Sequence, residues 1–146
     1  MRIYLDNCCF NRPFDDQMQI RISLETEAKL FIQSLIATSK VDFVWSYMLF
    51  YENSNNPFEV RRTAIINFSK YAKYTVTANN DILTIANEIN KRGIKEKDSL
   101  HIACAIYAKC DYFITTDDRI LKYKDDTIEI VDPNDFIKVW VEDDYE

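Results

Sequence analysis

The stretch DSLHIACAIYAKCDYFITTDD, residues 98–118, contains the pattern that decides the fold. Residues 99–109 are apolar on nearly every side of a helix, which is typical of a buried helix. We expect this helix to begin at Asp98, whose carboxylate is a good N-cap. The short apolar run 112–114 then predicts a buried strand that ends at Asp117 and Asp118. Together these patterns predict a buried helix that begins at an acid, followed by a strand that ends at two acids.

The same alternation extends in both directions from this stretch. Before it, we expect a strand at 3–5 ending at Asp6, a polar loop at 7–16, an amphipathic helix at 17–38, a strand at 42–45, a short helix at 46–53 and a helix opened by Pro57. Next come an apolar run at 74–76 and a helix capped by Asn80 that stops at Gly93. After it, we expect a strand at 127–131 and a last helix opened by Asp132 and Pro133.

Alternating helices and short apolar strands favour a mostly parallel sheet covered by helices on both faces, the α/β class. At 146 residues the chain is long enough for one domain, which we expect at residues 1–140, followed by an acidic C-terminal tail at 141–146. Ligands of such sheets bind beyond the carboxyl ends of the strands. Asp6 and Asp117 are both expected at that edge.

Composition excludes several classes of protein. A single glycine, Gly93, rules out the glycine-rich loops that bind dinucleotides or nucleotide phosphates. No apolar run approaches the roughly 20 residues needed to span a membrane, and the first acid comes too early for a signal peptide. We therefore expect a cytoplasmic protein with no membrane partner. The thiols are expected to be structural and reduced, since they lack metal-site spacing: Cys8, Cys9, Cys104 and Cys110.

The net charge of −6 is unevenly distributed. Residues 111–146 hold 12 acids and 4 bases, whereas residues 1–110 hold 12 acids and 14 bases. Basic residues gather in two stretches, 61–73 and 91–97. Either stretch is explained by a solvated helix face, and either also suits a nucleic-acid backbone. The overall acidity does not exclude a nuclease, because bound divalent cations neutralise a carboxylate cluster.

Four acids lie at positions where the expected elements end or begin: Asp6, Glu52, Asp98 and Asp117. Each alone is explained by capping or by exposure to solvent, and we assign those simpler roles to Asp15, Asp16 and Asp118. Four carboxylates packed together repel one another by several kcal/mol, on the order of 4 kcal/mol per close pair at moderate dielectric. Hard divalent cations with oxygen ligands remove that repulsion. The joint pattern therefore predicts a site for Mg²⁺ or Mn²⁺.

Four segments resemble the successive motifs of PIN domains, the family that includes the VapC-like toxins of toxin–antitoxin pairs. They are residues 4–7, 46–52, 98–105 and 113–117, and the resemblance covers about residues 2–131. It implies a three-layer α/β/α sandwich and a site in which Asp6, Glu52, Asp98 and Asp117 are both the metal ligands and the catalytic residues. The Thr-x-Asp spacing from Thr115 selects Asp117, with Asp118 left open. Cys8 stands where the family often has serine or threonine, and Asn7 is a possible substitute.

The resemblance implies an endoribonuclease that hydrolyses RNA phosphodiesters with Mg²⁺ or Mn²⁺, and that would act as the toxin beside an antitoxin protein. Single-stranded RNA and a second copy of the chain are the other expected partners. Residues expected to touch the substrate are Asn7, Arg12, Arg61, Arg62, Thr115 and Thr116. His101 is expected to be a core histidine with its hydrogen bonds satisfied.

Of four alternatives, two stay open at this point and two are disfavoured. A PIN-like fold kept as a catalytically silent interaction module, and a nuclease acting on DNA, both fit the same residues. A dehalogenase-like phosphatase requires a second aspartate two residues after the first, and that position is Cys8. A receiver domain requires an acidic pair before the first strand, and none is present.

Overall fold

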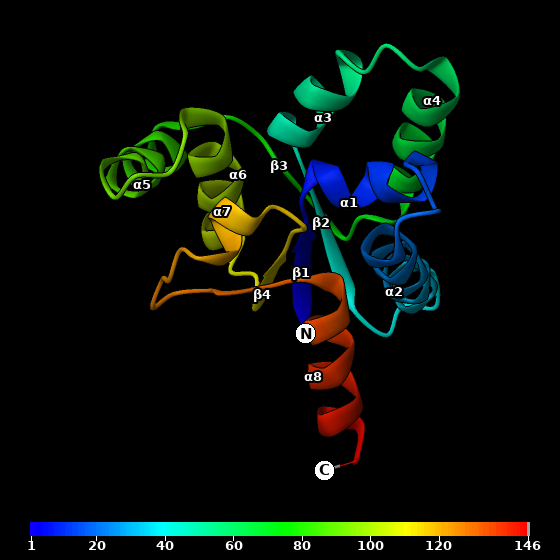
Figure 1. Cartoon of the computed structure of the whole chain (residues 1–146). Coiled ribbons are helices and arrows are strands. Elements are labelled where there is room, and N and C mark those ends of the chain that lie inside the picture. The colour runs from blue at the N-terminus through cyan, green and yellow to red at the C-terminus, as the bar shows by residue number, and fades with distance from the viewer. Residues whose placement is uncertain (146) are drawn as a thin grey trace.

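Five parallel strands form one sheet in the computed structural model, which describes residues 1–145 and their side chains as far as Glu142. The strand order is β3-β2-β1-β4-β5, and every neighbouring pair is parallel. The strands are β1 (Arg2–Leu5), β2 (Asp42–Ser46), β3 (Tyr74–Val76), β4 (Tyr112–Ile114) and β5 (Glu129–Val131). Helices cover both faces, so the fold is the expected three-layer α/β/α sandwich (Figure 1).

The central strand, β1, is apolar on both sides because both faces of the sheet are covered. Ile3, Tyr4 and Leu5 are fully buried. Tyr4 pairs in register with Val44 of β2 on one side and with Phe113 of β4 on the other. Tyr4 and Phe113 also stack, with ring centroids 5.3 Å apart. This packing aligns the carboxyl ends of β1 and β4.

The helices connect the strands and form the two outer layers. They are α1 (Asn7–Asn11), α2 (Ile20–Ala37), α3 (Tyr47–Ser54), α4 (Glu59–Phe68), α5 (Asn80–Lys91), α6 (Glu96–Tyr107), α7 (Asp118–Leu121) and α8 (Pro133–Tyr145), with 3-10 turns η1 (Arg12–Phe14) and η2 (Ser69–Tyr71). Figure 1 shows α1, α2 and α4 on one side of the sheet and α5 and α6 on the other. α8 packs against α2. No helix in residues 1–145 combines the length and apolar character that crossing a membrane requires.

The expected polar loop at 7–16 is wrong, because most of it is helical. The Asp6 side chain accepts a hydrogen bond from the Asn7 amide and so caps α1, and η1 follows directly. The sequence contains this cap, but only the fold shows that the chain turns into a helix immediately after β1. Asn7 and Cys8 are consequently held on a rigid element next to the acid.

Three helix starts also differ from expectation. α6 begins at Glu96, so Asp98 lies within the first turn and is not the cap. α5 is capped by Asn79, whose side chain accepts from the Ile82 amide, and not by Asn80. α4 begins at Glu59, two residues after Pro57.

The end of α5 and the start of α8 agree with the expectations from the sequence. Gly93 ends α5 with a φ of 102°, a backbone conformation that favours glycine. Asp132 accepts from the Asp135 amide at the start of α8. α8 continues to Tyr145, so residues 141–145 of the acidic tail prolong this helix, and Glu146 lies outside the described residues.

Candidate active site

Two of the expected acids are joined through a threonine at the carboxyl ends of β1 and β4. The Asp6 amide donates to the Ile114 carbonyl at 2.9 Å, which continues the pairing of the two strands. The Thr115 hydroxyl donates to Asp6 Oδ2 at 2.8 Å and accepts from the Asp117 amide at 3.1 Å. Thr115 is fully buried, so it orients Asp6 and the backbone of Asp117 and is not exposed to a substrate.

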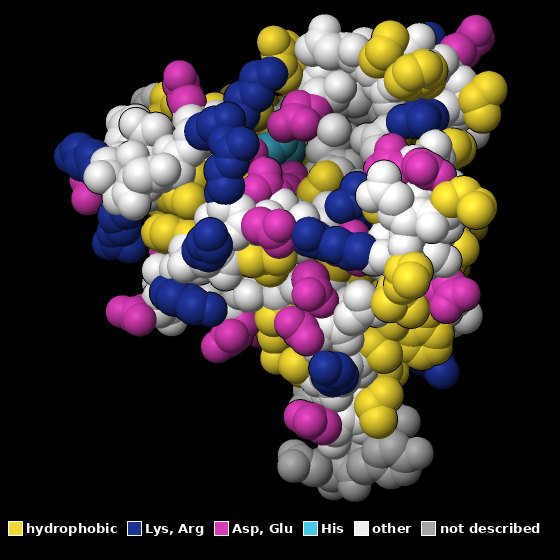
Figure 2. Space-filling model, in the orientation of Figure 1, with side chains coloured by type: hydrophobic (Ala, Val, Ile, Leu, Met, Phe, Trp, Pro, Cys, Tyr) yellow, Lys and Arg dark blue, Asp and Glu magenta, His cyan; other side chains and the backbone are white. Residues whose placement is uncertain are grey.

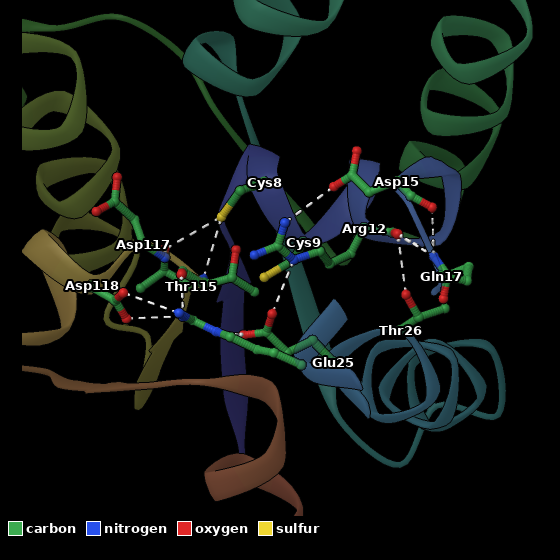
Figure 3. Close-up of polar contacts among 12 residues, drawn as sticks. Cys8, Cys9, Arg12, Asp15, Gln17, Glu25, Thr26, Thr115, Asp117 and Asp118 are labelled. Carbon is green, nitrogen blue, oxygen red and sulfur yellow. Dashed lines mark hydrogen bonds and ion pairs between the residues drawn. The ribbon is translucent and has the colours of Figure 1, made fainter. Parts of the chain in front are cut away.

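Cys8 completes this cluster with its sulfur atom. Its Sγ lies 3.4 Å from Thr115 Oγ1 and 3.5 Å from Asp6 Oδ2, and it accepts a hydrogen bond from the Thr116 amide at 3.3 Å. Figure 3 shows Cys8 pointing from α1 toward Thr115 and the loop that leads to Asp117. The thiol therefore supports the acids at the position where a hydroxyl was expected.

Glu52 reaches the site from α3 and is held by His101 of α6. His101 Nε2 lies 2.6 Å from Glu52 Oε1, and Nδ1 lies 2.6 Å from the Tyr4 hydroxyl. The Tyr4 hydroxyl is in turn 2.6 Å from Ser46 Oγ, which accepts from the Leu49 amide and caps α3. This buried row of polar groups joins β1, β2, α3 and α6. His101 is the buried, satisfied histidine that the sequence indicated, and it also positions Glu52.

The pKa values of this pair move in the directions expected for an ion pair. Burial lowers the pKa of His101, but the hydrogen bond to Glu52 and the charges of Asp6, Glu52 and Asp98 raise it above the usual value. Burial raises the pKa of Glu52, but the hydrogen bond and charge of His101, together with Lys97 and Asn7, lower it below the usual value. Glu52 is consequently ionised at neutral pH, with a protonated or hydrogen-bonded histidine behind it.

Asp98 lies within electrostatic range of the other three acids. Burial raises its pKa first, and the negative charges of Asp6 and Asp117 raise it further, followed by that of Glu52. Within the described side chains, Asp6, Asp98 and Asp117 form no ion pair with lysine, arginine or histidine. Asp6, Glu52 and Asp117 thus lie close enough to Asp98 for their charges to act on it, and the four residues form an acidic cluster with excess negative charge. Figure 2 shows acidic side chains gathered in the centre of this face, with basic side chains along its border.

The chemistry of this cluster fits a hard divalent cation. Its donors are carboxylate oxygens, and Mg²⁺ is usually bound by one or two carboxylates with water and substrate phosphate as the other ligands. Among the described residues, no group of three or more His, Cys, Asp or Glu side chains is placed to hold a metal ion. A site of one or two carboxylates with water as the other ligands needs no such group. The candidates for those one or two ligands are Asp6, Asp98 and Asp117, with Glu52 nearby.

Asp118 belongs to an ionic network that lies next to the acidic cluster. Arg21 of α2 forms two hydrogen bonds with the Asp118 carboxylate, at 2.9 and 3.0 Å, and another with the Thr116 carbonyl. Glu25, which is buried, pairs with Arg21 and with Arg12. Asp118 therefore faces Arg21 and anchors the start of α7, while its neighbour Asp117 remains on the side of the acids.

Most of the basic residues expected to touch substrate are engaged within the fold. Arg12 pairs with Glu25 at 3.0 Å and with Asp15 at 3.2 Å, as Figure 3 shows. Arg61 donates to the Phe14 carbonyl at 2.9 Å and lies over the Phe58 ring at 4.4 Å from its centroid. Arg62 donates to the Asn56 carbonyl at 2.9 Å. These bonds give each arginine a structural role in residues 12–62.

Unlike these arginines, Asn7 and Lys97 lie near one of the acids, Glu52, and both lower the pKa of its carboxylate. Asn7 is therefore near the acids, as the sequence suggested, whereas the exposed Lys97 belongs to the basic stretch 91–97. Thr116 is buried, and its backbone bonds to Cys8 and Arg21.

Comparison with solved structures places this architecture among known folds. The chain matches a chain in the crystal structure of VapBC2 from Rickettsia felis bound to a DNA fragment from their promoter, with a TM-score of 0.59. The match covers 89% of this chain and 97% of that chain, at 12% sequence identity. The fold is PIN-like. No protein-family model and no curated protein sequence matches the chain, so the likeness is one of fold.

Several supporting residues of this PIN-like site were not predicted from the sequence. They are Tyr4, Ser46 and His101, which hold Glu52, and Arg21 and Glu25, which hold the loop after β4. His101 carried a signal, because a lone histidine inside an apolar helix requires polar partners. Glu25 pairs with Arg21, four residues before it on the same helix, and with Arg12, 13 residues before it, and only the fold shows that it is buried between them.

Proposed function

We propose that this protein is a Mg²⁺- or Mn²⁺-dependent endoribonuclease that cleaves RNA as the toxin of a toxin–antitoxin pair. The observation that carries the proposal is the set of three acids without a cationic partner, Asp6, Asp98 and Asp117, at the carboxyl edge of a PIN-like sheet. Such a cluster is costly for the fold alone, since burial and mutual repulsion already raise the pKa of Asp98. A divalent cation offsets that cost.

In the proposed reaction, one or two of the carboxylates of Asp6, Asp98 and Asp117, with Glu52 nearby, would hold the cation and its water ligands. A bound ion would supply polarisation of the scissile phosphate and a water of lowered pKa as the attacking group. Thr115 and Cys8 fix the Asp6 carboxylate, and His101 keeps Glu52 ionised. No side-chain nucleophile is required.

Single-stranded RNA is the proposed substrate. Lys97, of the basic stretch 91–97, lies near Glu52 and suits contact with a phosphate backbone. Asn7 is the expected residue best placed to contact substrate. The arginines at 12, 61 and 62 would shape the loop beside the site, since their guanidinium groups already bond within the fold.

The proposed partners are an antitoxin protein that would cover the site in the cytoplasm, and a second copy of the chain. Solved VapBC2, whose fold is similar, supports an antitoxin partner. Exposed apolar side chains on α2 support the second copy, since a surface of this kind is typical of an interface: Ile20, Leu24, Leu30 and Phe31.

Incubation of the purified chain with varied RNAs and Mn²⁺ tests the proposal. We expect cleavage that a chelator abolishes and that Asp6→Asn loses. Cys110→Ala, two residues before the amino end of β4 and so at the other end of the strand from Asp117, is the matched control and should cleave like the wild type. A parallel melting experiment should show that Mn²⁺ raises the melting temperature of the wild type, because an ion bound only by the folded state stabilises it. The absence of both cleavage and a Mn²⁺-dependent shift would contradict the proposal, and cleavage of DNA alone would change the substrate.

A further inference from the structure

Lys29 of α2 is a buried amine without an acidic partner. It is 6% exposed, and its Nζ donates a single described hydrogen bond, to Gln33 Oε1 at 2.7 Å. No aspartate or glutamate among the described side chains lies within ion-pair distance of it. An ammonium group has three N–H donors. Two of them therefore have no protein acceptor.

Two aromatic rings, both deep in the core, lie beside this amine. Nζ is 5.6 Å from the centroid of the Phe10 ring and 5.5 Å from that of Phe68. The ring faces attract a cation, but this attraction does not replace a counter-ion when the cation is removed from water. Burial accordingly lowers the pKa of Lys29 to about 8, so that most of the amine still carries its charge at pH 7. The fold keeps an uncompensated positive charge in an apolar setting.

A cavity of about 140 Å³ opens onto the amine. Pro13 and Phe14 of η1, Leu30 of α2 and Ala64 of α4 line it together with the two aromatic rings. This volume is below the roughly 300 Å³ of the smallest sites for drug-sized ligands. Cavities of about 150 Å³ with apolar walls do accept a single benzene ring. The size therefore suits a fragment with one ring or a short branched chain.

We propose that this cavity binds a carboxylate carried on a small apolar body, with the carboxylate on Lys29 Nζ and the apolar part between Phe10, Phe14 and Phe68. The carboxylate would accept the two unused N–H groups and supply the missing negative charge. The apolar part would cover walls that a hydrated phosphate or a sugar leaves in contact with water. The same group can come from a free organic acid or from the end of a polypeptide that finishes in an apolar residue.

Benzoate is the first probe, and benzamide, which has the same shape without the charge, is its control. We expect benzoate to shift the NMR signals of Lys29, Phe10 and Phe68 in a saturable manner and to raise the pKa of the Lys29 amine, since a bound anion favours its charged form. Benzamide should bind at least about tenfold more weakly, because its neutral carbonyl accepts from the charged amine without supplying a negative charge. An acetylated dipeptide ending in phenylalanine, tested as the acid and as the amide, distinguishes the polypeptide source from the free acid.

Lys29→Met retains the length of the side chain and removes its charge, and Lys70→Met, on the exposed turn η2, is the matched control. We expect Lys29→Met to lose benzoate binding by about tenfold or more while Lys70→Met binds as the wild type does. The rise in the Lys29 pKa is measured on the wild type, so it does not depend on the folding of a variant. Equal binding of benzoate and benzamide, or no spectral change and no pKa change with benzoate, would overturn the proposal.

Discussion

Replacing His101 by leucine tests whether the buried row of polar groups holds Glu52 and stabilises the fold. Leucine has a similar size and a high helix propensity, so the change mainly removes two hydrogen bonds, both 2.6 Å long. Removing one member of a buried charged pair costs about 3–5 kcal/mol. Glu52 is partly exposed and can turn to water, and Tyr4 keeps its bond to Ser46. We therefore expect a loss of about 2–3 kcal/mol in the free energy of unfolding.

The loss of stability in His101→Leu depends on pH because the pKa values of His101 and Glu52 differ between the folded and unfolded states. The pKa of His101 is raised in the folded state, so its contribution is complete below the unfolded value near 6.5 and is lost as the pH rises through the folded value. The pKa of Glu52 is lowered, so its contribution is present above the unfolded value near 4.5 and is lost as the pH falls through the folded value. The difference between wild type and His101→Leu should be largest between about pH 4.5 and 6.5.

Urea unfolding from pH 5 to pH 9 measures this difference. Tyr4→Phe is the comparison variant, because it removes the hydroxyl that bonds to Ser46 and to His101 Nδ1 and leaves the contact between His101 and Glu52 in place. Its cost should be about 1–3 kcal/mol and should vary less with pH than that of His101→Leu, since the pair with Glu52 remains. A difference for His101→Leu that stays constant from pH 5 to pH 9, or a variant as stable as the wild type, would refute the role assigned to the pair.

Two further substitutions separate the site from its support. Asp98→Asn should abolish cleavage and yet raise the melting temperature of the metal-free chain, because it removes the repulsion from Asp6 and Asp117; a lower melting temperature would contradict the crowding of charge inferred here. Glu25→Gln should destabilise the fold by about 3 kcal/mol, since it leaves Arg12 and Arg21 without their buried partner, whereas Glu27→Gln on the exposed side of α2 should change little. Equal effects of these two glutamine substitutions in urea unfolding would remove Glu25 from the network.

The sequence predicted the sheet and the four acids because those features depend on local patterns. Apolar runs ending at Asp6 and Asp117 mark the carboxyl ends of strands, and the three-to-four spacing of α2 marks an amphipathic helix. The capping of α1 by Asp6, which the sequence offered as the simpler role of that acid, is local too, although the helix itself was not predicted. What these patterns share is that neighbouring residues alone determine them.

The supporting contacts were not predictable in this way, because they join residues far apart in the chain. His101 meets Tyr4 and Glu52 across 97 and 49 residues. The arginines at 12 and 61 read as free cations in the sequence, but Glu25, Asp15 and the Phe14 carbonyl occupy them in the fold. The sequence does not show which residue a charged side chain pairs with, so only the tertiary structure shows whether that side chain is available to a ligand.

The strand order has a consequence for synthesis on the ribosome. β1 is made first, but one of its two neighbours in the sheet is β4, and the Asp6 carboxylate receives its hydrogen bond from Thr115. Until residue 117 has left the exit tunnel, Asp6 has neither this threonine nor Asp117 beside it. An unfinished chain therefore cannot assemble the acidic cluster, and whatever chemistry the cluster performs begins only when most of the polypeptide is complete.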